Sequence, residues 1–129
     1  QAADENYLDA IVSLAVMQAT GRGTPQDYGA ALQNYMAAAA LGSDHAARGV
    51  GVMIWNGEGV AKDRPEAAAW FLVSAGMGNE EGQRSLQFAL NEMGDAADPR
   101  SIGLRASEIA ETLGLDIVFE LDETSDEGI

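Results

Sequence analysis

The chain has 129 residues, with 21 acidic side chains against 7 basic ones, a formal net charge of −14, one histidine and no cysteine. This length fits one domain, and the negative charge disfavours binding to nucleic acid or to anionic lipid. The lack of cysteine excludes disulfides and thiolate metal sites, one histidine cannot build a multi-histidine metal cage, and no apolar run approaches the roughly 18 residues of a membrane span.

A repeat of 36 residues organises the chain. When the sequence is shifted by 36 positions without a gap, eight of the 29 residues from 14 to 42 meet an identical residue, where about two or three are expected by chance. The identical pairs are Val16 and Val52, Met17 and Met53, Gly21 and Gly57, Gly23 and Gly59, Asp27 and Asp63, Ala31 and Ala67, Ala39 and Ala75, and Gly42 and Gly78. A second shift carries Gly78 onto Gly114, so the period predicts three units, at about 7–42, 43–78 and 79–114.

Unit one is predicted to hold a first helix ahead of its Gly-x-Gly turn and a second helix from Asp27 to Gly42. In the second helices, alanines at eight-residue spacing lie on one face, so neighbouring helices approach closely there. These alanines are Ala31 and Ala39 in unit one and Ala67 and Ala75 in unit two. Tyr35 and its counterpart Phe71 are predicted to fill the space between the helices.

Unit two repeats this arrangement. Ser43 or Asp44 is predicted to cap a first helix that runs to about Trp55, and Gly57-Glu58-Gly59 ends that helix. The second helix is predicted to begin at Asp63 and to end at Gly78. Pro65 lies in its first turn, and Glu66 follows Asp63 by three residues, which is a capping-box arrangement.

Unit three is degraded, because Met93 and Asp95 occupy the Gly-x-Gly positions. Its second helix is predicted to start at Asp98-Pro99 and to end at Gly114. Terminal repeats deviate because one of their faces meets solvent, so unit three is predicted to be a cap. The fold predicted from the three units is all-α, an alpha-solenoid of three stacked helix-turn-helix repeats within a single domain, 1–129.

Residues 115–129 are predicted to form a capping segment and an acidic tail. The apolar residues Ile117-Val118-Phe119 and Leu121 are expected to fold back over the exposed edge of unit three. The alternatives are the start of a further unit or a contact with another chain. Residues 116–127 hold six acids and no base, and Asp122 to Glu127 lack the glycine spacing and closing glutamate of a calcium loop, so this part is predicted to be disordered.

The string Gly57-Glu58-Gly59-Val60, followed by Asp63, Ala67, Trp70-Phe71, Ala75 and Gly78, resembles the Sel1-like repeat family, a relative of the tetratricopeptide repeats. The resemblance covers residues 8–92 well and 93–114 by spacing alone. Ala15 departs from the family's usual glycine, and Gln18 and Ile54 depart from its usual tyrosine. The resemblance implies an adaptor whose stacked helices form a concave surface that holds a protein or a peptide.

The resemblance bears on location and activity as well. Many bacterial members are exported, and the chain opens Gln-Ala-Ala-Asp without an initiator methionine. These observations favour a mature product of the bacterial periplasm or a secreted product; a fragment of a cytoplasmic protein is the alternative. A branch linked to penicillin binding depends on a disulfide in each repeat, and this chain has no cysteine, so that activity is not carried over.

Candidate binding residues follow from the first helices, which line the inner surface in this family. Val50 and Ile54, with Gly51 where helices cross, are predicted to face the core, and the 36-residue shift aligns the opposite faces of units two and three. The residues predicted to bind a partner are Trp55, Phe88, Arg48, Arg84, Val52, Asn56, His45 and Asn91. Arginine and exposed aromatic rings are typical of interface hot spots.

A structural interpretation of the same residues stays open. Trp55 would then cover the Gly-x-Gly turn, Phe88 would fill space, and the two arginines would pair with Glu81 or Asp44. His45 near a helix start is expected to be solvent-facing or capping, and no metal or cofactor is predicted.

Three functions remain in view. The leading hypothesis is a non-catalytic adaptor or scaffold that binds a protein or an extended peptide, because no serine has a plausible histidine partner. The second is a cell-envelope ligand-binding or hydrolytic protein. The third is a structural unit that self-associates end to end through the C-terminal edge near Ile117 to Phe119.

Overall fold

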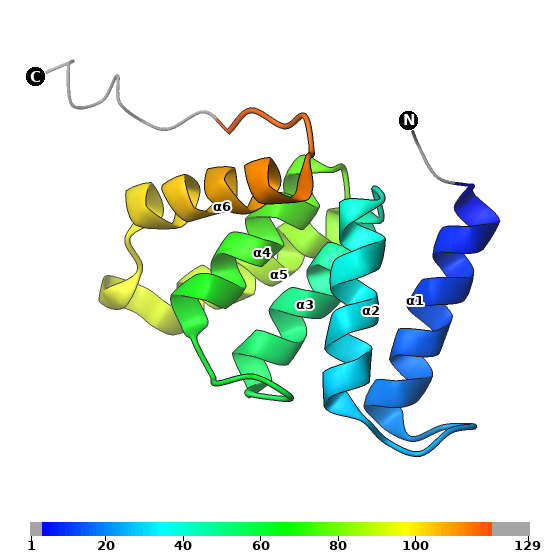
Figure 1. Ribbon diagram of the computed structural model, residues 1–129. Helices are drawn as coiled ribbons and strands as arrows, with labels where there is room; N and C mark the ends of the chain where they lie inside the picture. Colours follow the sequence, from blue (N-terminus) through cyan, green and yellow to red (C-terminus); the bar gives the residue numbers. More distant parts are fainter. Residues whose placement is uncertain (1–3, 120–129) are drawn as a thin grey trace, which may run out of the picture.

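The computed structural model describes residues 4–119 as an all-helical protein (Figure 1). The described residues form six α-helices and one short 3-10 helix, and they contain no strand. The helices are α1 (Glu5–Thr20), α2 (Tyr28–Ala40), α3 (Asp44–Asn56), α4 (Arg64–Gly76), α5 (Glu80–Met93), η1 (Gly94–Ala96) and α6 (Pro99–Leu113). The predicted all-α class is confirmed.

Side-chain caps begin α2 to α5, and the caps recur with the 36-residue period. Asp27 and Asp63 each accept a hydrogen bond from the backbone N–H three residues later, at 3.0 and 3.1 Å. Ser43 and Asn79 do the same for α3 and α5, at 3.1 and 2.6 Å. These bonds satisfy N–H groups that have no partner inside the helix, and they confirm the starts predicted for α2, α3 and α4.

The Gly-x-Gly turn of unit two requires its glycines for two different reasons. Gly57 ends α3 with a φ of +73°, a left-handed conformation that glycine adopts without strain. Gly59 also has a positive φ, and a Cβ at this position would lie only 2.9 Å from the Cβ of Tyr28. The turn therefore lies directly against the first residue of α2, and the predicted end of α3 is confirmed.

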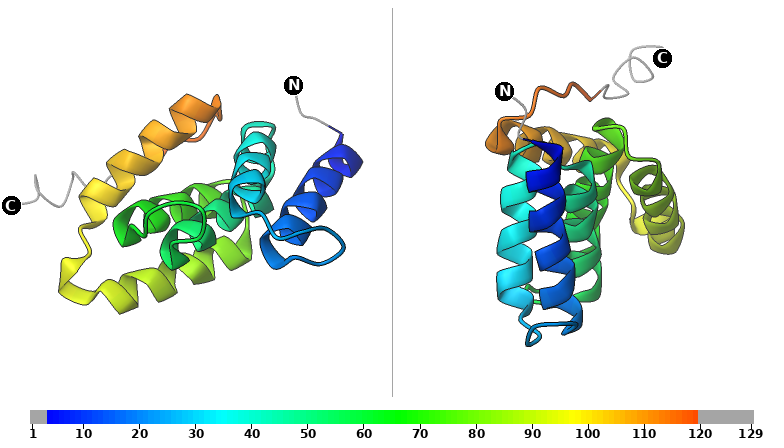
Figure 2. Two further views of the ribbon diagram at one scale, coloured as in Figure 1. Left: turned by 60° about the horizontal axis from the view of Figure 1, so that its bottom comes forward. Right: turned by 90° about the vertical axis from the view of Figure 1, so that its right-hand side faces the viewer.

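Consecutive helices from α1 to α5 pack side by side and build the solenoid (Figures 1 and 2). Two glycines let α3 approach its neighbours. A Cβ on Gly49 would lie 2.6 Å from the ring of Tyr35, and one on Gly51 would lie 2.6 Å from the ring of Phe71. Tyr35 and Phe71 are 8% and 3% exposed, so they fill the space between the helices as predicted.

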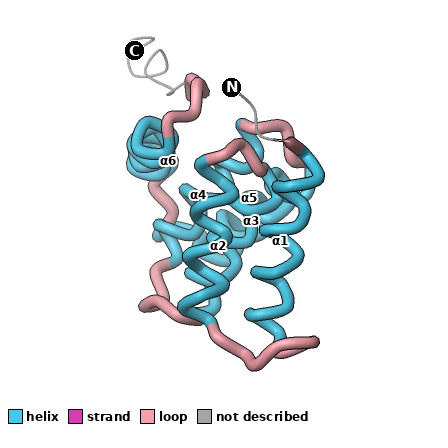
Figure 3. Tube along the Cα trace, turned by 45° about the vertical axis from the view of Figure 1, so that its right-hand side comes forward, coloured by secondary structure: helices cyan, strands magenta, loops and turns pink. Residues whose placement is uncertain are grey.

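Helix α6 departs from the pattern of the earlier units. It packs against α4 and makes no substantial contact with α5, the helix that precedes it in unit three (Figures 1 and 3). An ion pair joins α6 to α4: Nε and Nη2 of Arg105 donate to the two carboxylate oxygens of Glu66, at 2.8 and 2.9 Å. The prediction of a capping box is wrong for its second half, because Glu66 binds Arg105 while the Asp63 N–H donates to the Ile54 carbonyl.

The bounds of α6 agree with the sequence. Asp98 precedes Pro99 at its start, and Gly114 follows its last residue with a φ of +76°. Unlike Asp63, Asp98 makes no capping bond to a backbone N–H. Its carboxylate accepts a hydrogen bond from the Ser101 hydroxyl at 2.9 Å, and this bond lowers the pKa of Asp98 below its ordinary value.

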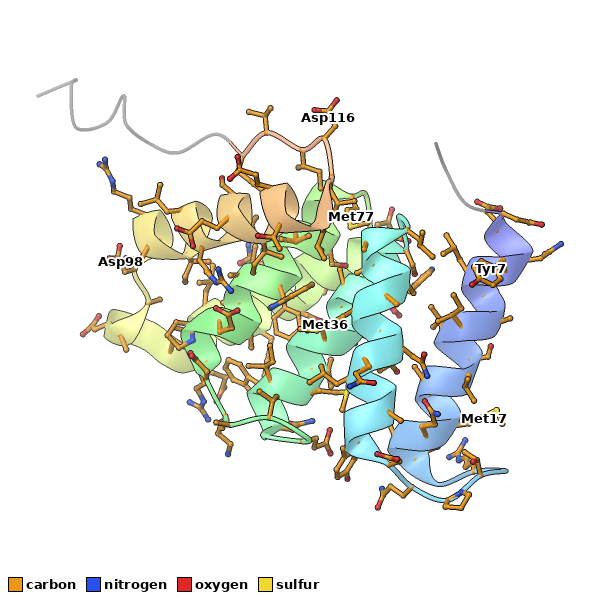
Figure 4. All side chains as sticks on the ribbon, viewed as in Figure 1. Tyr7, Met17, Met36, Met77, Asp98 and Asp116 are labelled. Carbon is orange, nitrogen blue, oxygen red and sulfur yellow. The ribbon has the colours of Figure 1, made fainter. Side chains whose placement is uncertain are left out.

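The segment after α6 folds back onto the helices. Leu115, Ile117 and Phe119 are half-buried against the core, whereas Val118 is 86% exposed. Asp116 is also exposed and points away from the helices (Figure 4). Atoms of Ile117 and Phe119 would lie 3.1 and 2.8 Å from a Cβ on Gly76, so the segment covers the end of α4.

The sequence places this segment at the edge of unit three, whereas its contact with Gly76 belongs to unit two. The reason is the position of α6, which lies on α4 and delivers the chain to the end of that helix. Leu121 and the predicted acidic tail, 122–127, lie outside the described residues.

Candidate functional site

The candidate site is a depression of about 370 Å³ between α3 and α5, the first helices of units two and three. Helix α3 contributes three lining residues, α5 contributes four, and one aromatic residue comes from α4. The lining residues are Arg48, Val52, Trp55, Phe71, Glu81, Arg84, Ser85 and Phe88. Five of the eight residues predicted to bind a partner therefore line one depression.

Two of the aromatic rings that line this depression are neighbours. The ring centroids of Trp55 and Phe88 lie 5.8 Å apart, and the rings are tilted by 59°. Phe88 is 55% exposed, which is unusual for a phenylalanine in a folded chain. The guanidinium carbon of Arg64, from the first turn of α4, lies 4.6 Å from the centroid of the Trp55 ring and holds that ring by a cation–π contact.

Two arginines flank the aromatic pair. Arg48 Nε donates to the Ser85 hydroxyl oxygen at 3.0 Å, which joins α3 to α5 across the depression. Neither Arg48 nor Arg84 forms an ion pair with a carboxylate of residues 4–119. The pairing with Glu81 or Asp44 that the structural interpretation expects is therefore not seen within those residues.

A buried phenol lies near Arg48. Burial raises the pKa of Tyr35 above its ordinary value, and the charge of Arg48 opposes that rise. The core face of α3 is the predicted one, since Val50 and Ile54 are buried. Trp55 and Val52, on the opposite face, are only half-buried.

Three predicted residues do not line the depression. His45 lies at the start of α3, where its Nδ1 is 3.1 Å from the side-chain nitrogen of Asn79, the cap of α5. The same Asn79 nitrogen donates to the Asp44 carboxylate at 3.2 Å, so His45 belongs to a polar contact between two helix starts. Asn56 and Asn91 are exposed near the ends of α3 and α5.

Sequence reasoning did not assign Ser85 and Arg64 to the site. Ser85 follows Arg84 directly on α5, and Arg64 begins a second helix, whereas only first helices were considered as binding elements. The proximity of Arg64 to Trp55 along the chain, across the Gly-x-Gly turn, is the signal that could have indicated their contact.

Other kinds of site find little support in the part of the chain that the structure describes. Residues 4–119 hold no group of three or more histidine, aspartate or glutamate side chains arranged to bind a metal. None of the described helices combines the length and the apolarity that crossing a membrane requires. A smaller hollow of about 210 Å³ lies between α2, α4 and α6, beside Trp70, whose buried indole N–H has no hydrogen-bond partner among the described residues.

Comparison with known proteins gives a consistent result. The family model of the Sel1 repeat matches residues 8–43 and 44–79, each one residue away from the predicted units. A Sel1 repeat protein from Oxalobacter formigenes has a similar structure, with 36% identity and a TM-score of 0.58 over 63% of this chain and 61% of that one. No curated protein matches the chain.

A second similar structure is a protective antigen present in uropathogenic Escherichia coli strains, which displays an SLR fold. It has 34% identity and a TM-score of 0.65, and the match covers 81% of this chain and 23% of the antigen. The chain thus spans less than two thirds of the length of either structure. Both structures are described as Sel1 or SLR repeat proteins.

Proposed function

Because the chain belongs to the Sel1 repeat family, we propose that it is a non-catalytic adaptor that binds a protein or an extended peptide in the depression between α3 and α5, on the concave face of the solenoid. Sel1 repeat proteins are generally protein-interaction scaffolds. The partner is not identified by this membership, because repeat proteins vary the residues of one binding surface.

The observation that carries the proposal is the half-exposed aromatic pair. Burying the free part of Phe88 and the adjoining face of Trp55 under a partner would remove apolar surface from water and so favour association. Aromatic and arginine side chains dominate the binding energy of most interfaces, and both types line this depression.

A non-catalytic role is supported by the chemistry of the lining residues. The one hydroxyl among them, that of Ser85, accepts a hydrogen bond from Arg48, which is not a base, and no hydrogen bond joins it to Glu81, the one lining carboxylate. The single histidine of the chain, His45, does not line the depression and contacts Asn79. Acyl transfer would need a nucleophile and a base within hydrogen-bond reach of each other.

The test is an affinity capture from an extract of the source organism, with the wild-type chain and two matched variants as bait. Phe88→Ala removes an aromatic ring that is 55% exposed, and Tyr7→Ala removes one that is 57% exposed on α1. We expect the wild type and Tyr7→Ala to retain the same partner, and Phe88→Ala to lose it.

Thermal unfolding of the three baits provides the control for folding, since two equally exposed side chains should contribute little to stability. Retention of the partner by Phe88→Ala, or equal loss by Tyr7→Ala, would place the binding surface elsewhere and contradict the proposal.

A further inference from the structure

Basic side chains gather at the aromatic pair in a chain that is otherwise acidic. Of the seven lysines and arginines, Arg48 and Arg84 line the depression and Arg64 stacks on Trp55. Glu81 is the one carboxylate among the lining residues. The depression thus concentrates positive charge on a protein with a net charge of −14.

The two lining guanidinium groups are available to a partner. Arg48 uses its Nε–H for the Ser85 hydroxyl, and its two terminal amino groups have no hydrogen bond or ion pair with a described residue. Arg84 is exposed on α5 and has none either. Both groups line the same depression as the aromatic pair.

Arg105, in contrast, is paired with carboxylates. Its guanidinium binds Glu66 by two hydrogen bonds and Glu108 by a third, so the fold does satisfy an arginine where carboxylates are placed for it. A guanidinium group matches the geometry of a carboxylate, and the attraction is strengthened when binding excludes water. No carboxylate of residues 4–119 fills that match at Arg48 or Arg84.

The charged part of the depression requires a ligand with carboxylates, and its apolar part requires that the ligand also carry an apolar group. Phe71 and Val52 contribute apolar lining, and the rings of Trp55 and Phe88 lie beside the arginines. A ligand that offered only charge would leave these rings exposed to water. A ligand that offered only apolar groups would cover the arginines and leave their charges without partners, which is costly.

We infer that the depression binds an acidic segment of a partner protein, one in which aspartate or glutamate stands beside an apolar or aromatic residue. The carboxylates bind Arg48 and Arg84, and the apolar side chain lies on Trp55 and Phe88. The inference rests on the proposed function and states the chemistry of the partner. Positive charge at the depression also steers acidic partners to it against the repulsion of the remaining surface.

The experiment uses a phage-displayed library of random peptides, selected on the full wild-type chain. We expect the recovered peptides to be rich in aspartate and glutamate next to tryptophan, phenylalanine or leucine. Fluorescence anisotropy with a recovered peptide then measures its affinity at increasing salt concentration. The affinity should fall as salt rises, because charge–charge attraction at an exposed site is screened.

Two exposed arginines provide a matched pair of variants for the affinity measurement. Arg84→Gln removes a charge from the depression, and Arg22→Gln removes the same charge from the turn of unit one. We expect Arg84→Gln to weaken binding of the acidic peptide by about tenfold, the value of one charged hydrogen bond, and Arg22→Gln to leave it unchanged. Arg48→Gln should weaken it similarly.

The outcomes separate this inference from the proposed function. Recovered peptides that are neutral or basic, yet lose binding with Phe88→Ala, would overturn the acidic partner and leave the adaptor standing. Acidic peptides that bind Arg84→Gln and Arg22→Gln equally would overturn it too. Failure to recover any peptide, or binding that Phe88→Ala does not affect, would overturn both.

Discussion

Gly51 sets how closely α3 and α4 approach each other. A Cβ at this position would lie 2.6 Å from the ring of Phe71 and 3.2 Å from the backbone carbonyl of Ala67. The carbonyl belongs to α4 itself and cannot move aside as a flexible side chain would. The small residue is therefore required by packing, although glycine in a helix costs about 1 kcal/mol relative to alanine.

The first prediction compares Gly51→Ala with Gly29→Ala. A Cβ at Gly29, in the first turn of α2, would meet only the Asp27 carboxylate at an ordinary 3.6 Å. We expect Gly51→Ala to lower the free energy of unfolding by about 1–3 kcal/mol through overpacking, and Gly29→Ala to raise it by up to about 1 kcal/mol. Denaturant unfolding measures both, and a Gly51→Ala variant as stable as the wild type would show that α3 can shift.

Much of the candidate site follows from the sequence because helices one repeat apart present the same face. Applied to Arg48 and Val52, the 36-residue register points to Arg84 and Phe88 on α5, and all four residues line the same depression. Helical periodicity cannot separate the centre of a groove from its ends, so it also included His45, whose partner is Asn79.

At the scale of the elements, the segment after α6 is held by few side chains. Ile117 and Phe119 lie over Gly76, whereas Val118 between them is 86% exposed. This alternation is that of an extended segment with one face on the core. Ile117 and Phe119 should therefore stabilise the packing of this segment, and Val118 should contribute little.

The second prediction tests this alternation. Phe119→Ala should lower the free energy of unfolding by about 1–2 kcal/mol, because a half-buried ring is lost from the end of α4. Val118→Ala should change it by less than about 0.5 kcal/mol, as surface substitutions do. Equal losses for the two variants in denaturant unfolding would show that the segment does not rest on Gly76.

Local signals predict helix bounds well and helix partners poorly. A cap such as Asp63 acts on the N–H three residues later, so its effect is contained in a short stretch of sequence. The packing of α6 on α4 joins residues that are far apart in the sequence, as Glu66 and Arg105 are, 39 residues apart. No pattern within a single repeat indicates that pairing. The sequence therefore predicted that Glu66 would complete a capping box, and it did not predict that α6 would pack on α4 and not on α5.

At the scale of the whole molecule, the helices differ in how many neighbours hold them. Helix α4 packs against α3, α5 and α6 and contributes seven buried residues. Helix α1 packs against α2 and contributes one, Ala15. In a stack of repeats the stability of each element depends on its own contacts and those with its neighbours, so local opening should begin at α1.

The third prediction is that native-state hydrogen exchange will distinguish these helices. Backbone amides around Ala15 in α1 should exchange faster than those around Phe71 in α4, and α4 should approach the protection of global unfolding. Exchange by mass spectrometry or NMR measures the rates directly. Equal protection of α1 and α4 would mean that residues 4–119 open only as one cooperative unit.

The order in which helices pair has a kinetic consequence. From α1 to α5 each helix packs on the next one in the chain, so these contacts have low contact order and close only short loops. A topology of this kind folds rapidly, by extension from whichever hairpin forms first. Helix α6 is the exception, because its partner α4 is separated from it by α5, and so its docking must follow the formation of α4.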